Sequence, residues 1–545
     1  MKITKNKIRH FILIFAIIFG GITLTNSCTD LDEVVYSQMM AEDFHPTEED
    51  VLAIMAPVYS IMRDVYFGWH GHFDFQEESA DVLVTPGRPN GWVDGGVYRR
   101  LHLQDWTAEQ SHPGGLWTRC FNGINNANRV MHQFEQGQPS LGEMEDQFMA
   151  ELRVARAFYY SLLLDVIGNV PIVTEWDVPD GFLPEQNTRQ EVFNFVTTEI
   201  EEALPHLSEV VDLNTYGRFN MWAAKAVLAR TYLNAEVYVG SSHWDKVIEY
   251  TDAIITSGHF ALDPNYSAIF ATENMGSSEL VYAVPFDNLH GPWFHLHMKT
   301  LHPANQATYE IEGAPWGGIA ALPQFIDTYD EDDQRMYDTW IMGPQFSSTG
   351  DTLYCNLGAE MMGKPLVFVN EMTDVYFAQE HQGYRVGKYE IEMGARGMLS
   401  NDFPVFRYAD ILFMKAEALM RTGDAGGAAA LVTQVRERAF PTNPEKAVVT
   451  GSELLEGSSY NYGYVEEGEI VIEQGGDDIQ YGRFLDELGW EFAAEGRRRT
   501  DLIRFGVFTT KYRLSFQGSE EFRTLMPVPQ GRIDTNPNLQ QNTGY

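Results

Sequence analysis

Helical periodicity over the middle of the chain is the feature that most limits its possible folds. Across residues 151–166, apolar side chains recur every three or four positions, and Gly168 and Pro171 follow closely. This spacing places the apolar side chains on one face of a helix, which the glycine and the proline then end. The segment therefore predicts an amphipathic helix with one buried face.

Helical segments then recur in pairs. Residues 219–239 are rich in alanine and are followed by Gly240 and a second periodic segment at 244–255. A similar pair occupies 408–420 and 425–439, and we expect a further helix at about 485–495. Small side chains let the two helices of a pair approach closely, and the unit looks like a tetratricopeptide-type hairpin. The sequence predicts a mostly α-helical scaffold of such hairpins.

Two long segments, 68–115 and 276–350, show no helical period. Both are rich in Gly, Pro, Trp, His and Tyr. Long loops of this kind usually carry function. We therefore expect them to be loops inserted into the helical scaffold and to hold the ligand site.

Composition and charge exclude several classes of protein. Hydrophobic residues make up 44% and aromatic residues 13% of the 545 residues, enough for a large core. The 77 acidic residues outnumber the 38 basic ones, so the net charge is −39 and nucleic acid is excluded as a partner. The three cysteines exclude a disulfide scaffold, and we expect Cys120 and Cys355 to be buried and reduced.

The N-terminus has the pattern of a secreted lipoprotein. Four basic residues precede an apolar run at 11–24, too short for a permanent membrane span, and Cys28 follows it. We expect a signal peptide over 1–27, a lipidated tether over 28–40 and a single domain over 41–545, with the lipid on Cys28. The alternative is an ordinary secretory signal in which Cys28 has no special role.

Short sequence blocks resemble the SusD/RagB family of Bacteroidetes outer-membrane glycan-binding lipoproteins, in the family's order. They are 115–117 (GLW), 124–128 (INNAN), 151–160 (ELRVARAFYY), 168–171 (GNVP), 217–219 (GRF), 407–410 (RYAD), 415–418 (KAEA), 495–498 (EGRR), 501–504 (DLIR), 527–530 (PVPQ) and 536–545.

The resemblance implies a SusD-like fold with four tetratricopeptide-like units, no catalysis and no cofactor. It also implies a lipid-anchored protein on the outer membrane, exposed at the cell surface. There it would capture a polysaccharide or oligosaccharide and deliver it to a SusC-like TonB-dependent transporter.

Tryptophans in the loops are the first candidates for ligand contact. A sugar ring has an apolar C–H face, which binds against flat aromatic side chains with polar groups at their rims. Trp92, Trp293 and Trp316 each lie beside a glycine or a proline, which leaves an indole face open. Their placement is similar to the platform of xyloglucan-binding SusD-like proteins of the surface glycan-binding protein A type.

A flat platform suits an extended β-1,4-linked chain. Xyloglucan or another β-linked plant glucan is therefore the expected ligand. The remaining tryptophans that lie in helices or blocks are expected in the core: Trp106, Trp117, Trp176, Trp222, Trp244 and Trp490.

Polar residues near these tryptophans are candidates for binding sugar hydroxyls. We select Asp74, Asn90, Asp94 and Arg99, for each of which an ordinary structural role is the alternative. Further candidates are Glu77, Arg88, Asn288, His290 and Lys299.

Metal binding and catalysis find little support in the sequence. His290, His295, His297 and His302 have no cysteine nearby, and His295 and His297 alternate as on a strand. No nucleophile elbow, zinc-protease motif or phosphate loop is present. A peptide-binding relative on the same scaffold and a secreted polysaccharide-degrading enzyme remain the alternative functions.

Overall fold

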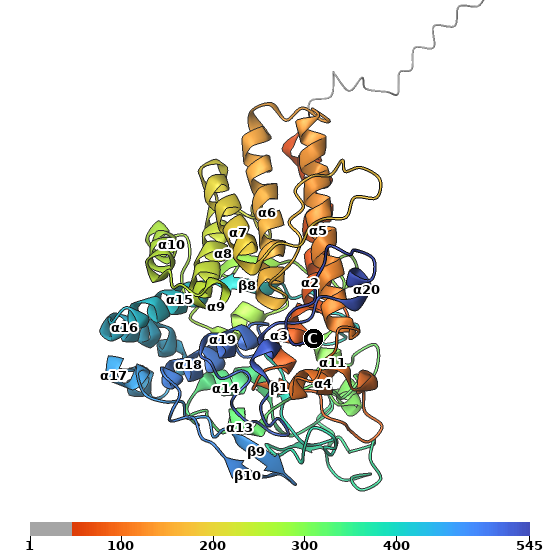
Figure 1. Ribbon diagram of the computed structural model, residues 1–545. Helices are drawn as coiled ribbons and strands as arrows, with labels where there is room; N and C mark the ends of the chain where they lie inside the picture. The colour runs from red at the N-terminus through yellow and green to blue at the C-terminus, as the bar shows by residue number, and fades with distance from the viewer. Residues whose placement is uncertain (1–45) are drawn as a thin grey trace, which may run out of the picture. The chain divides into compact units, whose positions relative to one another are not determined.

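Four long helices pack side by side in the order α2, α5, α6 and α7 (Figure 1). The computed structural model describes residues 46–545, so the predicted signal peptide, Cys28 and the predicted boundaries at 28 and 41 lie outside the described residues. The helices span Glu48–Phe67, Ser111–Glu135, Glu145–Val166 and Arg189–Ala203. Capping boxes formed by Thr47 with Asp50 and by Thr188 with Glu191 start α2 and α7. At Gly123 of α5, a Cβ would come within 2.4 Å of the Tyr159 ring of α6, so glycine permits the close packing.

The predicted helical hairpins are confirmed. Helix α8 (Met221–Leu233), continued by α9 (Ala235–Val239), packs against α10 (Trp244–Ser257). Helix α15 (Tyr408–Arg421) packs in the same way against α16 (Ala425–Arg436), and α18 covers Gly482–Phe492. The scaffold is thus mostly helical, as predicted, with the tetratricopeptide-like arrangement.

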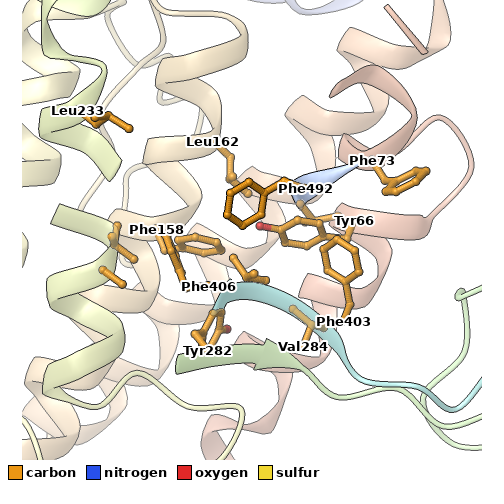
Figure 2. Close-up of a cluster of buried hydrophobic side chains, with 14 of the residues drawn as sticks. Tyr66, Phe73, Phe158, Leu162, Leu233, Tyr282, Val284, Phe403, Phe406 and Phe492 are labelled. Carbon is orange, nitrogen blue, oxygen red and sulfur yellow. The ribbon is translucent and has the colours of Figure 1, made fainter. Parts of the chain in front are cut away.

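All named strands of the described part pair in twos. The longest pair with both strands fully buried is β2 (Leu280–Val284) with β8 (Phe403–Arg407), which run antiparallel through the core. Figure 2 shows side chains of these strands, including Tyr282 and Phe406, beside Phe158 of α6. The other pairs are β1 (Leu83–Val84) with β3 (Ala320–Ala321), β4 (Trp340–Ile341) with β7 (Arg385–Val386), β5 (Gly343–Pro344) with β6 (Val367–Phe368), and β9 (Gly463–Glu466) with β10 (Glu469–Glu473).

The two segments expected to be loops contain short helices, and this part of the prediction was wrong. Helices of four to seven residues complete at most two turns, too few for an apolar period to show. They are α3 (His72–Glu78), α4 (Val97–Leu103), α11 (Leu296–Thr300), α12 (Gln306–Tyr309), α13 (Pro323–Ile326) and α14 (Gln334–Thr339). Three more follow towards the C-terminus: α17 (Gly451–Leu454), α19 (Arg498–Arg504) and α20 (Gln530–Ile533).

A buried ion-pair network joins α18 to the strands and to α14. The Glu491 carboxylate of α18 accepts hydrogen bonds from Arg335 at 3.0 Å and from Arg407 and Arg438 at 2.7 Å each. Glu491, Arg335 and Arg407 are buried, and the Arg438 side chain is 5% exposed. The three guanidinium groups hold the pKa of Glu491 well below its usual range, although burial alone would raise it.

Cys120 and Cys355 are buried free thiols, which confirms the expectation of reduced cysteines. Burial raises the pKa of the Cys355 thiol to about 11 and that of Cys120 higher still. Both side chains therefore remain protonated and unreactive at neutral pH.

Candidate functional site

Three indole rings from distant parts of the chain meet on one surface. Trp69 follows the end of α2, Trp92 lies in the segment after β1, and Trp316 lies between α12 and β3. The ring centroids are 5.3 Å apart for Trp69 and Trp316, 5.7 Å for Trp92 and Trp316, and 6.0 Å for Trp69 and Trp92. We call these three residues the tryptophan cluster.

Backbone contacts fix Trp92 beside Trp316. The N–H of Trp92 donates to the carbonyl of Trp316 at 3.1 Å. At Gly318, a Cβ would come within 2.7 Å of the Trp92 ring. Only glycine leaves the space that this ring occupies, so the Trp92 ring packs directly against the backbone of the segment that carries Trp316.

The rings of the cluster are not coplanar. Trp69 and Trp316 are inclined by 26°, whereas Trp92 is tilted by 53° and 52° from them. The His295 ring packs on Trp69 at 4.9 Å. Trp69 is 40% exposed, and Trp92 and Trp316 are partly buried. The cluster therefore presents a curved aromatic surface rather than the flat platform that was expected.

Trp293 is not part of this cluster. Its ring is partly buried and packs against the main hydrophobic core, without ring contact to Trp69, Trp92 or Trp316. Trp293 has a backbone φ of 106°, a left-handed conformation that is uncommon for a large side chain. The structure thus brings together two of the three predicted tryptophans, Trp92 and Trp316. The third member of the cluster is Trp69 and not Trp293.

A buried ion pair lies behind the tryptophan cluster. Lys299 of α11 and Asp74 of α3 are each 2% exposed, and Lys299 Nζ lies 2.5 Å from Asp74 Oδ1. Lys299 Nζ is 5.8 Å from the ring centroids of both Trp69 and Trp92 and 5.1 Å from that of Tyr98. The Tyr98 hydroxyl donates to Asp74 at 3.2 Å, and burial followed by the Asp74 charge raises the pKa of this phenol well above its usual range.

The predicted role of Asp74 therefore needs correction. Its carboxylate is engaged by Lys299 and Tyr98 and is shielded from solvent, so it supports the aromatic surface and is not placed to contact a ligand. The cation behind two indole faces fixes α3, α4 and α11 against the cluster.

The other selected polar residues, Asn90, Asp94 and Arg99, come from the chain segment around Trp92 and are exposed or partly exposed. Asp94 Oδ2 is 2.6 Å from His70 Nε2, next to Trp69 in the chain. Asn90 is exposed and donates to the carbonyl of Leu357 at 2.6 Å. The Arg99 guanidinium lies 5.2 Å from the centroid of the exposed Tyr376 ring.

Two other candidates, Glu77 and Arg88, have structural roles. Glu77 is fully buried and accepts from the backbone N–H of Gly496 and of Arg497. Arg88 donates to the carbonyls of Gln379 and Gln382.

The histidines form no metal site. His297 lies in helix α11 and His295 directly before it, so the expected strand alternation was wrong. Within residues 46–545, no group of three or more His, Cys, Asp or Glu side chains is arranged to hold a metal ion.

The stability of the fold is expected to depend on pH through Glu78, which lies near the buried ion pair of Lys299 and Asp74. It is fully buried, and burial together with the nearby Asp74 charge raises its pKa from 4.5 to about 8. Because the folded protein keeps this proton to a higher pH than the unfolded chain does, the carboxyl destabilises the fold increasingly as pH rises from about 4.5 to 8. We expect Glu78→Gln to melt several degrees above the wild type at pH 8.5 and at the same temperature near pH 4.5.

Thermal unfolding followed by circular dichroism at both pH values measures this effect. Glu109→Gln, at an exposed position, serves as the control and should leave the melting temperature unchanged. Equal shifts for Glu78→Gln at the two pH values would contradict the assignment.

Two further tryptophans, Trp69 and Trp176, lie in places that the sequence did not predict. Trp69 lies between Gly68 and His70, so the glycine criterion that selected Trp92 also applied to it. Trp176 was expected in the core but is 46% exposed, whereas Trp106, Trp117, Trp222 and Trp490 are buried as predicted. Trp244 is partly buried.

The fold and the site define a helical-hairpin protein with a cluster of partly exposed indoles on one surface. Comparison with known proteins gives this class a family. A model described as "SusD family" matches residues 301–545, and one described as "Starch-binding associating with outer membrane" matches residues 31–233. The chain belongs to the SusD family.

Curated relatives align over most of the chain. SusD-like protein P25 of Formosa agariphila is 22% identical, over 99% of this chain and 100% of its own. The starch-binding protein SusD of Bacteroides thetaiotaomicron is 26% identical, over 83% of this chain and 82% of its own.

Solved structures share the fold. Surface glycan-binding protein A from Bacteroides thetaiotaomicron, in complex with laminarihexaose, superposes with a TM-score of 0.69 at 18% identity, covering 91% of this chain and 100% of that one. A laminarin-binding SusD-like protein gives 0.68 at 21% identity, covering 92% and 100%.

Proposed function

We propose that this protein binds a glycan at the tryptophan cluster without chemically altering it. The observation that carries the proposal is the meeting of three indoles, one of them 40% exposed, from segments far apart in the sequence. Aromatic faces bind the apolar C–H faces of sugar rings, and the polar groups that we propose for the hydroxyls are those of Asn90, Asp94 and Arg99, from the chain segment around Trp92. The names of relatives that bind starch, laminarin or laminarihexaose support a glycan ligand.

The ligand that we propose is a β-linked glucan, xyloglucan or another member of this class. A straight β-1,4-linked chain matches coplanar rings, whereas a β-1,3-linked glucan such as laminarin follows a curved path. Because Trp92 is tilted by more than 50° from its two neighbours, the geometry favours the curved chain.

The cellular setting is also part of the proposal. A lipid on Cys28 would anchor the protein to the outer membrane, exposed at the cell surface. A family model whose description includes association with the outer membrane supports this location. From there the protein would pass its oligosaccharide to a SusC-like TonB-dependent transporter.

Affinity electrophoresis tests the ligand class. The purified protein is run through native gels that contain laminarin, xyloglucan, xylan, mannan or starch, beside a gel without polysaccharide. We expect strong retardation by laminarin, weaker retardation by xyloglucan and none by starch. Retardation by starch alone would replace the β-glucan by an α-glucan, and free migration in every gel would contradict glycan binding.

A further inference from the structure

A second hollow lies among the long helices, away from the tryptophan cluster. A groove of about 500 Å³ is bounded by α5, α6, α7 and the segment 174–177 that follows α6. Figure 1 shows the three helices packed side by side. The volume of the groove falls in the range that accommodates a small ligand or a few side chains of a partner. No residue of the tryptophan cluster contributes to its lining.

The floor of this groove is a charge-balanced network. Glu199 of α7 accepts hydrogen bonds from Arg153 at 2.8 Å and from Arg156 at 2.6 Å, and Arg153 also contacts Glu202 at 2.6 Å. Two arginines and two glutamates cancel in charge. Arg156 is only 6% exposed, and its Nε–H has no acceptor within the described residues. The Arg156 Nε–H is thus a buried donor without an acceptor, and the four charged side chains of the floor have no net charge.

The rim of the groove is negative and aromatic. Glu135 at the end of α5 and Glu175 and Asp177 beside Trp176 form no ion pair with any residue in the range 46–545. All three are exposed, and the Trp176 indole between the last two is 46% exposed. An indole bordered by unpaired carboxylates is the environment that an arginine or lysine side chain prefers.

Apolar side chains complete the lining. Met131, which is 5% exposed, and Met149, which is partly buried, line the groove. Apolar side chains beside a charged rim are typical of protein-binding surfaces. A neutral sugar would leave the three rim carboxylates without a counter-charge, so the chemistry differs from that of the tryptophan cluster.

We infer that this groove binds a polypeptide partner through an arginine or lysine side chain flanked by apolar residues. The cation lies over the Trp176 indole within reach of Glu175 and Asp177, and the flanking apolar side chains pack on Met131 and Met149. The unpaired carboxylates of the rim favour a positively charged arginine or lysine side chain of the partner. The inference does not depend on the glycan proposal, because the two surfaces share no residue.

The probe is the capped tripeptide acetyl-Phe-Arg-Phe-amide, with citrulline in place of arginine as an uncharged partner of nearly equal shape. Binding to the purified protein is measured by isothermal titration calorimetry at low and at high salt. We expect the arginine peptide to bind at least tenfold more tightly than the citrulline peptide, with affinity falling at high salt.

Variants locate the binding. Trp176→Ala and the double variant Glu175→Gln/Asp177→Asn should each reduce affinity at least tenfold, and because these side chains are exposed the variants should melt like the wild type. Trp69→Ala should leave peptide binding unchanged. No binding at millimolar peptide, equal affinity for the citrulline peptide, or insensitivity to Trp176→Ala would each overturn the inference, as would competition at the groove by laminarin.

Discussion

Replacing Trp69 by alanine is expected to weaken glucan binding by at least tenfold, the largest functional effect of any single substitution at the tryptophan cluster. Trp69 is the most exposed of the three indoles and stacks on Trp316 at 5.3 Å, so it supplies contact area and also holds its neighbour. A tenfold loss corresponds to about 1.4 kcal/mol, within reach of one aromatic contact together with the apolar area it covers. Isothermal titration calorimetry with the oligosaccharide of whichever glucan retards the protein measures it.

The matched control for this variant is Trp176→Ala. Both substitutions remove an exposed indole, but Trp176 lies at the groove between α5, α6 and α7 and outside the cluster. We expect unchanged glucan affinity for Trp176→Ala. If Trp69→Ala also binds glucan like the wild type while folding normally, the cluster is not the glycan site.

The largest effect on stability is expected for Glu491→Gln. This substitution keeps the shape of the side chain but removes the single negative charge that Arg335, Arg407 and Arg438 share in the core. Removing one partner from a buried ion-pair network costs about 3–5 kcal/mol. Each arginine keeps another carboxylate, Asp333 for Arg335 and Glu279 for Arg407 and Arg438, but the network then carries one more positive charge than its carboxylates balance. Urea unfolding monitored by tryptophan fluorescence should show the transition at a clearly lower denaturant concentration.

Glu473→Gln is the control for this prediction. Glu473 lies on β10, is exposed and forms no ion pair within the described chain, so its loss of charge should move the urea midpoint very little. A change of less than about 1 kcal/mol for Glu491→Gln would mean that the remaining glutamates, Glu279 and Glu495, neutralise the arginines without it.

The sequence predicts best those helices that are long enough to show several apolar repeats within one segment of the chain. The helices at 151–166, 219–255 and 408–436 show several apolar repeats each, and the structure confirms them. Helix α3, with seven residues that are all buried, has no polar face and therefore no period to detect. The same limit applies to α11, which carries Lys299.

The candidate site was partly predictable for a similar reason. A glycine next to a loop tryptophan is a local signal, and it selected Trp92 and Trp316, whose rings lie 5.7 Å apart in the structure. The burial of Asp74 depends on Lys299, which is 225 positions away in the chain, so no local pattern could separate a supporting carboxylate from a ligand-binding one. The tilt of Trp92 likewise results from tertiary packing against Gly318 and Tyr98.

The tryptophan cluster is assembled from residues near positions 69, 92 and 316, which meet only when the loops and helices that carry them have folded together. The unfolded chain consequently has no binding surface, and a ligand of this cluster acts as a selective stabiliser of the native state. By mass action, a ligand at one hundred times its dissociation constant adds about 2.7 kcal/mol to the free energy of unfolding. The protein would thus be most resistant to unfolding when the ligand of the tryptophan cluster is abundant.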